Sequence, residues 1–452
     1  MIFKRKIYSK LLGWKSDSKG TKALLIEGAR RIGKSTIVEE FAKNEYKSYI
    51  LVDFNDVSDV VIDAFNRYLN DLDTFFMILS TEYGVTLHKR ESLIIFDEIQ
   101  KFPKARQSIK KLVKDGRYDY LETGSLISIK ENVKNITIPS EERHIKMYPM
   151  DFEEFCWALG EEKMSEYIKN CFMDKKPLLD NFHHKAMLLF KQYMLVGGMP
   201  LVVASYVLNN RSFAKADIEK RDILSLYSDD INKADVIYRK KVSTIFAKIP
   251  SFLSSHEKRI KFSKIGAGQR SENYGEAFFW LEDSMMCNVC YNCNNPNVGL
   301  SLNEDLSSIK CYMGDTGLLI SHTFTEKEVQ DENLYKQVLH DNLSINEGMF
   351  YENIIAQSLI ANGYKLYFYT KYNAEQHRNE MEIDFIISNN SKVKPKIFPI
   401  EVKSSKQYKT VSLDKFMSTF SERIGNGIVI HTKNLSVEEN KLYIPCYMAF
   451  CL

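Results

Sequence analysis

The sequence predicts an α/β protein of several domains, and three observations support this fold class. A short apolar run, Ala23 to Ile26, leads into a glycine-containing loop and a helix-forming segment. A second apolar run, Ser92 to Phe96, ends in two adjacent acids. Near the carboxy terminus, a helical segment precedes three strand-like segments, another helix and another strand. Apolar runs of this length suit strands that are buried in a sheet covered by helices.

Length and composition describe a globular chain. At 452 residues it is too long for one ordinary core, so we expect several domains. Hydrophobic residues make up 44% and charged residues 27%, which is typical of soluble globular proteins and not of disordered ones. The net charge of +3 neither requires nor excludes nucleic acid, because a local basic groove can exist within a nearly neutral total.

We expect no export signal and no membrane span. The amino-terminal stretch is basic but lacks the apolar core of a signal peptide. The most apolar stretch, Tyr193–Leu208, is interrupted by Gly197, Gly198 and Pro200, which predicts two packed helices joined by a turn. Eight cysteines over this length do not suggest a disulfide scaffold. A cytoplasmic location without a membrane partner is therefore predicted.

The loop after the first apolar run predicts a nucleotide site. Residues 28–35, GARRIGKS, match the P-loop pattern G-x4-G-K-[ST] in full. Glycines in such a loop let backbone N–H groups surround phosphates. Lys34 is expected to reach the β- and γ-phosphates of ATP, and the Ser35 hydroxyl to ligate Mg²⁺. The predicted ATP-binding residues here are Gly28, Ala29, Arg30, Arg31, Ile32, Gly33, Lys34, Ser35 and Thr36.

The two acids after the second apolar run complete the predicted Mg²⁺-ATP site. Asp97 is expected to hold the hydration shell of the metal, and Glu98 to orient and deprotonate the attacking water. Lys34 and Glu98 are thus the predicted catalytic residues, and Ser35 and Asp97 the metal ligands.

Two further runs, Ser48–Phe54 and Tyr118–Ser125, are expected to be strands of the same sheet. In the second run, Thr123 or Ser125 is placed to sense the γ-phosphate. Arg143 is a candidate arginine finger or sensor.

Arg30 and Arg31 lie inside the loop and leave three interpretations open. They can contact phosphate, contact an adjacent subunit of a homo-oligomer, or form salt bridges on the loop surface.

The middle of the chain is predicted to be a helical lid or connector followed by a winged helix. Helical segments at Lys240–Leu253 and Tyr274–Met285 precede strands at Cys287–Cys293 and Ile309–Met313. A basic run accompanies them, comprising Lys258, Arg259, Lys261, Lys264 and Arg270. Such a run can contact DNA, but it equally suits a solvated face of a packing module.

Four cysteines leave two interpretations open. Cys287, Cys290 and Cys293 have the spacing of iron–sulfur or zinc ligands, and Cys311 is a candidate fourth ligand. Alternatively, the same segment is a strand in which small apolar cysteines pack.

The last part of the chain predicts a second α/β domain with the order α-β-β-β-α-β. The segments are Leu343–Asn362, Tyr364–Tyr372, Met381–Asn389, Lys396–Ser404, Leu413–Phe420 and Gly427–Thr432. The first helix carries Glu352, the middle strand Asp384, and the third strand Glu401 and Lys403. Because alternate residues of a strand face the same side, Glu401 and Lys403 point together.

This order of elements, with Glu, Asp and Glu-x-Lys in sequence, resembles the PD-(D/E)XK nuclease fold. Asp384 and Glu401, completed by Glu352, would bind Mg²⁺, which lowers the pKa of a bound water. Glu401 and Lys403 would then be catalytic. The resemblance leaves open whether the domain cleaves or keeps only the shape.

The motifs GARRIGKST, FDEIQKFP, ETGS and RHIKMYPMDFEEF together resemble AAA-type ATPases of the archaeal-ATPase and STAND kind. The motifs GGMP at residues 197–200 and YMGDTGLL at residues 312–319 resemble the carboxy-terminal region that follows such ATPase modules. The resemblance covers most of the chain.

We therefore expect four domains: an ATPase core at 1–151, a helical lid or connector at 152–235, a winged helix at 236–325 and a restriction-endonuclease-like α/β domain at 326–452. The expected function is ATP hydrolysis coupled to binding or cleavage of DNA or another nucleic acid, with ATP and Mg²⁺ as cofactors. The alternative is a nucleotide-controlled switch or scaffold whose nuclease-like domain is not catalytic.

Overall fold

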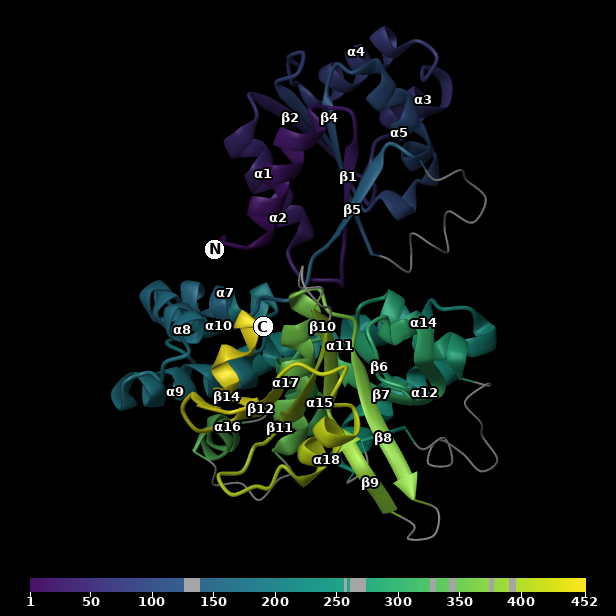
Figure 1. Cartoon of the computed structure of the whole chain (residues 1–452). Helices are drawn as coiled ribbons and strands as arrows, with labels where there is room; N and C mark the ends of the chain where they lie inside the picture. The colour runs from purple at the N-terminus through teal and green to yellow at the C-terminus, as the bar shows by residue number, and fades with distance from the viewer. Residues whose placement is uncertain are drawn as a thin grey trace. The chain divides into compact units, whose positions relative to one another are not determined.

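The computed structural model describes residues 1–125, 139–255, 258–260, 274–325, 331–340, 347–373, 378–389 and 396–452. The chain forms two compact units (Figure 1). The amino-terminal unit contains Met1–Tyr148 and Asp283–Met285, and the carboxy-terminal unit contains Pro149–Glu282 and Met286–Leu452.

The amino-terminal unit is built on a five-stranded parallel sheet in the order β2-β3-β4-β1-β5. Its strands are β1 (Ala23–Glu27), β2 (Ser48–Asp53), β3 (Ser92–Asp97), β4 (Asp119–Gly124) and β5 (Glu142–Lys146). Its helices are α1 (Ile7–Ser18), α2 (Lys34–Glu45), α3 (Asp59–Arg67), α4 (Leu72–Tyr83), the short η1 (Ile99–Lys101) and α5 (Pro103–Asp115).

The apolar runs of the sequence form the centre of this sheet. Every residue of β1, β3 and β4 is buried, as expected for parallel strands covered on both faces. The predicted membership of residues 48–54 and 118–125 in the same sheet is confirmed. Phe65 and Phe75 of α3 and α4 pack with Phe54 and Phe96 in one hydrophobic cluster on this sheet.

The carboxy-terminal unit begins with helices. They are α7 (Phe152–Ala158), α8 (Glu162–Asp174), α9 (Asp180–Val196), α10 (Pro200–Leu208), α11 (Phe213–Asn232), α12 (Val236–Ser254) and α14 (Gly275–Asp283). The predicted break in the apolar stretch is confirmed, because α9 ends at Val196 and α10 starts at Pro200 at an angle of 118° to it. In the described part of the chain, no single helix is long and apolar enough to cross a membrane, and α9 with α10 is the one bent pair that meets both criteria together.

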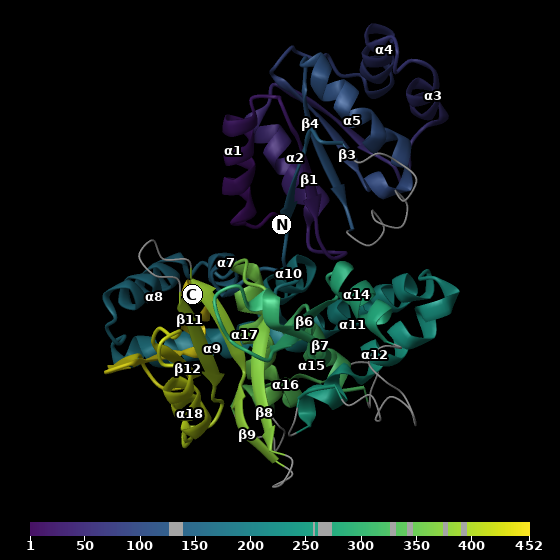
Figure 2. The ribbon, with the colours of Figure 1, turned by 45° about the vertical axis from the view of Figure 1, so that its right-hand side comes forward.

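The remaining elements of this unit are two sheets and their helices (Figure 2). The strands are β6 (Cys287–Cys293), β7 (Glu304–Met313), β8 (Tyr367–Asn373), β9 (Arg378–Ile383), β10 (Phe385–Asn389), β11 (Lys396–Val402), β12 (Gly427–His431), β13 (Ser436–Glu438) and β14 (Lys441–Pro445). The helices are η3 (Leu300–Asn303), α15 (Thr316–Thr323), α16 (Glu332–Leu339), α17 (Gly348–Ala361), α18 (Val411–Thr419) and η4 (Cys446–Cys451). The strand orders are β7-β6-β8-β9 and β10-β11-β12-β14-β13.

The GGMP and YMGDTGLL motifs meet in the core of this unit. Asp315 caps α15 by accepting a hydrogen bond from the Leu318 N–H, and its other oxygen accepts one from the Gly198 N–H. A Cβ atom at Gly198 would lie 2.1 Å from the carbonyl oxygen of Met150, so glycine alone permits this backbone approach. These two motifs therefore join the α9–α10 turn to the amino terminus of α15.

The structure corrects the predicted middle strand of the last domain. Residues 381–389 do not form one strand, because the chain changes sheets at Asp384. β9 pairs with β8, whereas β10 pairs with β11. Asp384 accepts a hydrogen bond from the Val402 N–H of β11 at 2.8 Å, which holds the two sheets together at this point.

The predicted winged-helix segment contains the expected helices and hairpin, α12, α14, β6 and β7. The hairpin also forms a sheet with a strand outside this segment, because β6 pairs in parallel with β8. A shared sheet therefore crosses the expected boundary at residues 325 and 326, and the four-domain division stays a prediction. Of the basic run, Lys261, Lys264 and Arg270 lie outside the described residues, as do Leu343 and the start of the predicted helix there.

Candidate functional site

The first candidate site is the loop between β1 and α2, at the carboxyl edge of the parallel sheet. Arg31 and Gly33 have φ values of 66° and 86°, so the loop enters the left-handed region twice. A Cβ atom at Gly28 would lie 2.6 Å from the carbonyl oxygen of Met147, so glycine allows the loop to pass beside the chain that follows β5. Lys34 and Ser35 are the first residues of α2.

Lys34 folds into this loop. Its Nζ atom donates hydrogen bonds of 3.0 Å to the carbonyl oxygens of Gly28 and Ala29. Burial lowers the pKa of Lys34, and the carboxylates of Glu98 and Asp97 oppose this shift. A cation inside a glycine-containing turn at a helix amino terminus forms a setting suited to phosphate.

Arg5 holds the loop from outside, a contact that the sequence analysis missed. Its guanidinium donates to the carbonyl oxygen of Ile32 at 3.1 Å and to that of Tyr148 at 2.7 Å. Ile32 itself is fully buried. No local pattern marks Arg5, because its partners lie far away along the chain.

The acids after β3 lie at the same edge of the sheet. Thr123 at the end of β4 donates a hydrogen bond to Asp97, and its hydroxyl oxygen accepts one from the Glu98 N–H at 3.3 Å. Glu98 has a φ of 53°, a conformation that non-glycine residues rarely adopt and that is concentrated at functional sites. Gln100 donates to the Glu98 carboxylate. Thr123 thus holds Asp97 and the backbone of Glu98 together.

The other predicted residues of this site differ in exposure and in distance from the loop. Arg30, Arg31 and Thr36 are exposed around the loop, and Ser35 is half-buried. Ser125 follows Gly124, which pairs with Glu27, so Ser125 also lies at the loop edge.

Arg143 is not brought to the loop. It pairs with Leu24, three residues before the end of β1, or about 10 Å along the strand. Its guanidinium lies 3.7 Å from the carboxylate of Asp17. A role toward a neighbouring copy of the chain stays a prediction.

A buried polar network in the same sheet was also not predicted from the sequence. Arg106 of α5 donates two hydrogen bonds to Glu142, at 3.1 and 2.7 Å. His144 lies 2.8 Å from Glu142 and 3.1 Å from Glu27, and these hydrogen bonds raise the pKa of His144 to about 9. Burial raises the pKa of Glu122 well above its usual value, and nearby Glu142 adds to this rise. The network ties α5, β1, β4 and β5 together.

The second candidate site is a cluster of acids and lysines in the carboxy-terminal unit. Lys310 of β7 is buried, with its Nζ atom 3.2 Å from Glu352, 3.3 Å from Glu382 and 3.8 Å from Asp384. Lys258 and Tyr312 also donate hydrogen bonds to Glu352. Although burial opposes its ionisation, Lys258 and Lys310 lower the pKa of Glu352 to about 2.

Glu401 lies on β11, and Lys403 follows the end of this strand. The Lys403 Nζ atom lies 2.6 Å from Glu401 Oε1. Among the described residues, Glu401 Oε2 is buried without a hydrogen-bond partner. Burial raises the pKa of Glu401 and, with the charge of Glu352, raises that of Asp384 to about 7. Asp384 thus lies beside Lys310 and Glu352 and accepts a hydrogen bond from the residue after Glu401, and the metal-ligand set of Glu352, Asp384 and Glu401 stays a prediction. Lys258, Lys310 and Glu382 were not foreseen.

The four cysteines are buried free thiols. On the strand β6, Cys287 and Cys293 face one side and Cys290 faces the other, because side chains alternate along a strand. Within the described part of the chain, no three histidine, cysteine, aspartate or glutamate side chains form a group that can hold a metal ion.

Three family models match separate segments of the chain. Residues 20–156 match an AAA domain, residues 187–328 a domain of unknown function (DUF8612), and residues 347–449 another domain of unknown function (DUF4143). No curated protein matches the chain. The first match, together with the parallel sheet, supports an AAA-type P-loop ATPase domain in the amino-terminal unit.

Comparison with solved structures finds distant likenesses. A signal transduction ATPase (STAND) protein with a tetratricopeptide repeat sensor from Pyrococcus horikoshii is 11% identical with a TM-score of 0.27, and the match covers 80% of this chain and 48% of that one. Cdc6p from Pyrobaculum aerophilum is 12% identical with a TM-score of 0.25, over 74% and 93% of the two chains. The Hef helicase domain from Pyrococcus furiosus is 12% identical with a TM-score of 0.18, over 65% and 78%. The chain thus spans about half the length of the first protein, and scores this low do not define a fold.

Proposed function

We propose that the amino-terminal unit, as an AAA-type P-loop ATPase domain, binds Mg²⁺-ATP and hydrolyses it. The observation that carries this proposal is the position of Lys34, whose ammonium lies within the loop against Gly28 and Ala29. Asp97 and Glu98 end a strand two places away in the same parallel sheet, with β4 between. A triphosphate in the loop would therefore meet both the lysine and the acids.

The residues at this edge of the sheet have different roles in hydrolysis. Mg²⁺ fits here because Ser35 and Asp97 offer the hard oxygen ligands that it prefers, and when bound it neutralises charge on the phosphates. Lys34 and the loop N–H groups bind the phosphates. Glu98 orients the attacking water and accepts its proton, while Thr123 holds Asp97 in place.

Nucleotide binding and ATP turnover by the full-length chain test this proposal. Lys34→Ala should abolish binding or turnover. Glu98→Gln should bind ATP but hydrolyse it at least roughly a hundredfold more slowly, because it lacks the base. Lys43→Ala, which removes an exposed ion pair with Glu39 on α2, is the matched control and should behave as wild type. Unchanged turnover in Glu98→Gln would remove Glu98 from its assigned role.

For the carboxy-terminal unit we propose a nuclease-like fold that binds nucleic acid and is coupled to the ATPase. Its support is the order α17, β8, β9, β10, β11, α18 and β12, in which β9 and β10 belong to different sheets. In this order β10 and β11 are antiparallel, whereas β11 and β12 are parallel. Of the four residues of the resemblance, Glu401 and Lys403 pair with each other, and Asp384 accepts a hydrogen bond from Val402 between them.

Metal-dependent cleavage is a second candidate function, and one observation favours it. Glu401 Oε2, buried and without a partner among the described residues, is suited to a cation, and Asp384 lies next to β11. Glu352 does not fit the same role, because Lys258, Lys310 and Tyr312 already donate to its oxygens. Asp384 and Glu401, without Glu352, would hold Mg²⁺. The lysines around Glu352 favour the alternative, a switch or scaffold that binds without cutting.

A cleavage assay separates these alternatives. The full-length chain is incubated with plasmid or single-stranded DNA and with Mg²⁺ or Mn²⁺, in the presence and absence of ATP. Cleavage that is abolished in Glu401→Ala and retained in Glu380→Ala, an acid on β9 outside the cluster, would support a nuclease. No cleavage alongside intact ATP turnover would favour the switch or scaffold.

A further inference from the structure

The acid–lysine cluster shares one face of the sheet β7-β6-β8-β9 with a polar cavity. Lys310 pairs with Cys290, and Asn292 on the same face of β6 pairs with Asp305 and Phe368. Thr370 pairs with Glu382, which contacts Lys310. Because paired residues of neighbouring strands point to the same face, the side chains of Asn292, Asp305 and Thr370 stand beside the cluster.

A bulge in β7 forms one wall of this cavity. The register of β6 with β7 shifts between Tyr291 and Asn292, which leaves Leu306, Ser307 and Ser308 without partners on β6. Bulges of this kind are frequent beside functional sites, where they redirect side chains. Arg259 and Ile260 also line the cavity, and the Ile260 N–H donates to the carbonyl oxygen of Ile309 on β7.

The cavity has the size of a small-molecule site. Its volume is about 390 Å³, within the roughly 300–1,000 Å³ of ligand pockets and far larger than a single inorganic anion. Its polar lining consists of Arg259, Asn292, Asp305, Ser307, Ser308 and Thr370, and Tyr372 adds an aromatic ring.

Two hydroxyl groups in the lining lack partners. Ser308 Oγ and Thr370 Oγ1 are both buried and, as far as the described residues extend, form no hydrogen bond. A buried polar atom without a partner costs about 1–3 kcal/mol, so both positions are stabilised when a ligand supplies the partner. The single acid of the lining, Asp305, already accepts hydrogen bonds from Ser307, which reduces its repulsion of an anion.

We propose that this cavity binds one nucleoside monophosphate unit, either as a free nucleotide or as part of a nucleic-acid strand. The Arg259 guanidinium and the Ser308 and Thr370 hydroxyls bind the phosphate, because a cation and O–H donors in one cavity suit its oxygens. Tyr372 stacks on the base. The proposal rests on the proposed function in one respect: it names the unit that the nuclease-like region recognises.

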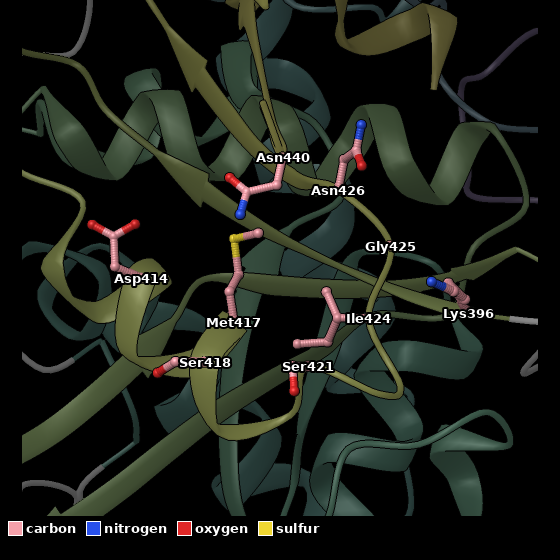
Figure 3. Close-up of a pocket in the computed structure, with 9 residues that line it drawn as sticks. All are labelled: Lys396, Asp414, Met417, Ser418, Ser421, Ile424, Gly425, Asn426 and Asn440. Carbon is pink, nitrogen blue, oxygen red and sulfur yellow. The ribbon is translucent and has the colours of Figure 1, made fainter. Parts of the chain in front are cut away.

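A second cavity provides an internal control. It is about 460 Å³ in volume and lies beside α18, lined by Asp414, Ser418 and Asn440 among others (Figure 3). Its groups have partners of their own, because Ser418 donates to the carbonyl oxygen of Lys415 at 2.9 Å and Asp414 pairs with Lys441. Ser418→Ala therefore removes a hydroxyl of the same kind from a cavity to which we assign no ligand.

Binding is measured on the full-length chain with Lys34→Ala as background, so that the P-loop does not contribute. The probes are the four ribonucleoside 5′-monophosphates, by calorimetry, and fluorescent single-stranded DNA and RNA, by anisotropy. Ser308→Ala and Thr370→Val should each weaken binding roughly three- to tenfold, and Arg259→Gln roughly tenfold or more. Ser418→Ala should leave binding unchanged. Melting temperatures confirm that each variant is folded.

The measurements distinguish a free nucleotide from a nucleic-acid strand as the ligand, and they separate the cavity proposal from the proposed nucleic-acid binding. If the three cavity variants weaken the binding of monophosphates, the ligand is a free nucleotide. If they weaken only the binding of single-stranded DNA or RNA, the ligand is part of a nucleic acid. Either result supports the cavity proposal. If single-stranded DNA or RNA binds equally well to all three variants, or if Ser418→Ala weakens its binding as much, the cavity proposal is wrong. The proposal that the chain binds nucleic acid is then unaffected. Monophosphate binding without any strand binding supports the cavity and contradicts the proposed nucleic-acid function. No binding of either probe overturns both.

Discussion

Lys310 lies 3.2 Å from Glu352 in a contact between the strand β7 and the helix α17, and both side chains are buried. Lys310 also lies close to Glu382 and Asp384, so one buried ammonium group interacts with three acidic side chains. Such a buried cation stabilises the fold mainly because the acids would otherwise be left unpaired.

Lys310→Met should therefore lower the free energy of unfolding by about 3–5 kcal/mol, since it keeps the volume but removes a buried cation that contacts Glu352, Glu382 and Asp384. Urea unfolding of the full-length chain measures this. Lys371→Met, which removes a half-exposed lysine of β8 that pairs with Glu380 of β9, should cost no more than about 1 kcal/mol. Equal effects of the two substitutions would contradict the role of Lys310.

Gly198→Ala should destabilise the carboxy-terminal unit by roughly 1–3 kcal/mol or more, because the new Cβ atom would meet the Met150 carbonyl at 2.1 Å. The matched control is Gly275→Ala at the start of α14, where a Cβ atom meets nothing within 4 Å. Calorimetry should show a lower melting temperature in the first variant only. A stable Gly198→Ala protein would argue against the close packing of the two motifs.

Thr123→Val should slow ATP turnover roughly tenfold or more while changing nucleotide affinity less. The substitution keeps the shape of the side chain but removes the hydroxyl that holds Asp97 and the Glu98 backbone. Steady-state kinetics and a separate binding titration distinguish the two effects. Thr81→Val on the exposed face of α4 is the control, and similar turnover in both variants would exclude a positioning role for Thr123.

The contribution of His144 to the stability of the fold should decrease as the pH becomes alkaline. Its hydrogen bonds to Glu142 and Glu27 raise its pKa to about 9, above the value of about 6.5 in an unfolded chain. The protonated form thus favours the folded state, so its contribution is complete below about pH 6.5 and disappears as the pH rises through about 9.

Calorimetry of wild type and His144→Gln at several pH values tests this. The difference in melting temperature should be largest near pH 6, should shrink as the pH rises above about 6.5 and should be small above about pH 9. His340→Gln, at an exposed position in the other unit, provides the comparison. A difference that grows with pH would contradict the assigned sign.

Local patterns were enough to predict much of the fold. The P-loop, the strands around it and the break between α9 and α10 follow from apolar runs, glycines and a proline that act over a few residues. Glu401 and Lys403 also lie on one side of their strand, as alternation predicts.

The sequence alone therefore determined the types of element, their order and the loop that is suited to phosphate, because these depend on neighbours along the chain. Only the tertiary structure decided that Arg5 braces the loop, that Arg143 lies away from it, and that Lys310 enters the acidic cluster. It also decided that the hairpin β6–β7 shares a sheet with β8. These relationships depend on how distant segments pack and share charge in the interior, where no local periodicity records the partner.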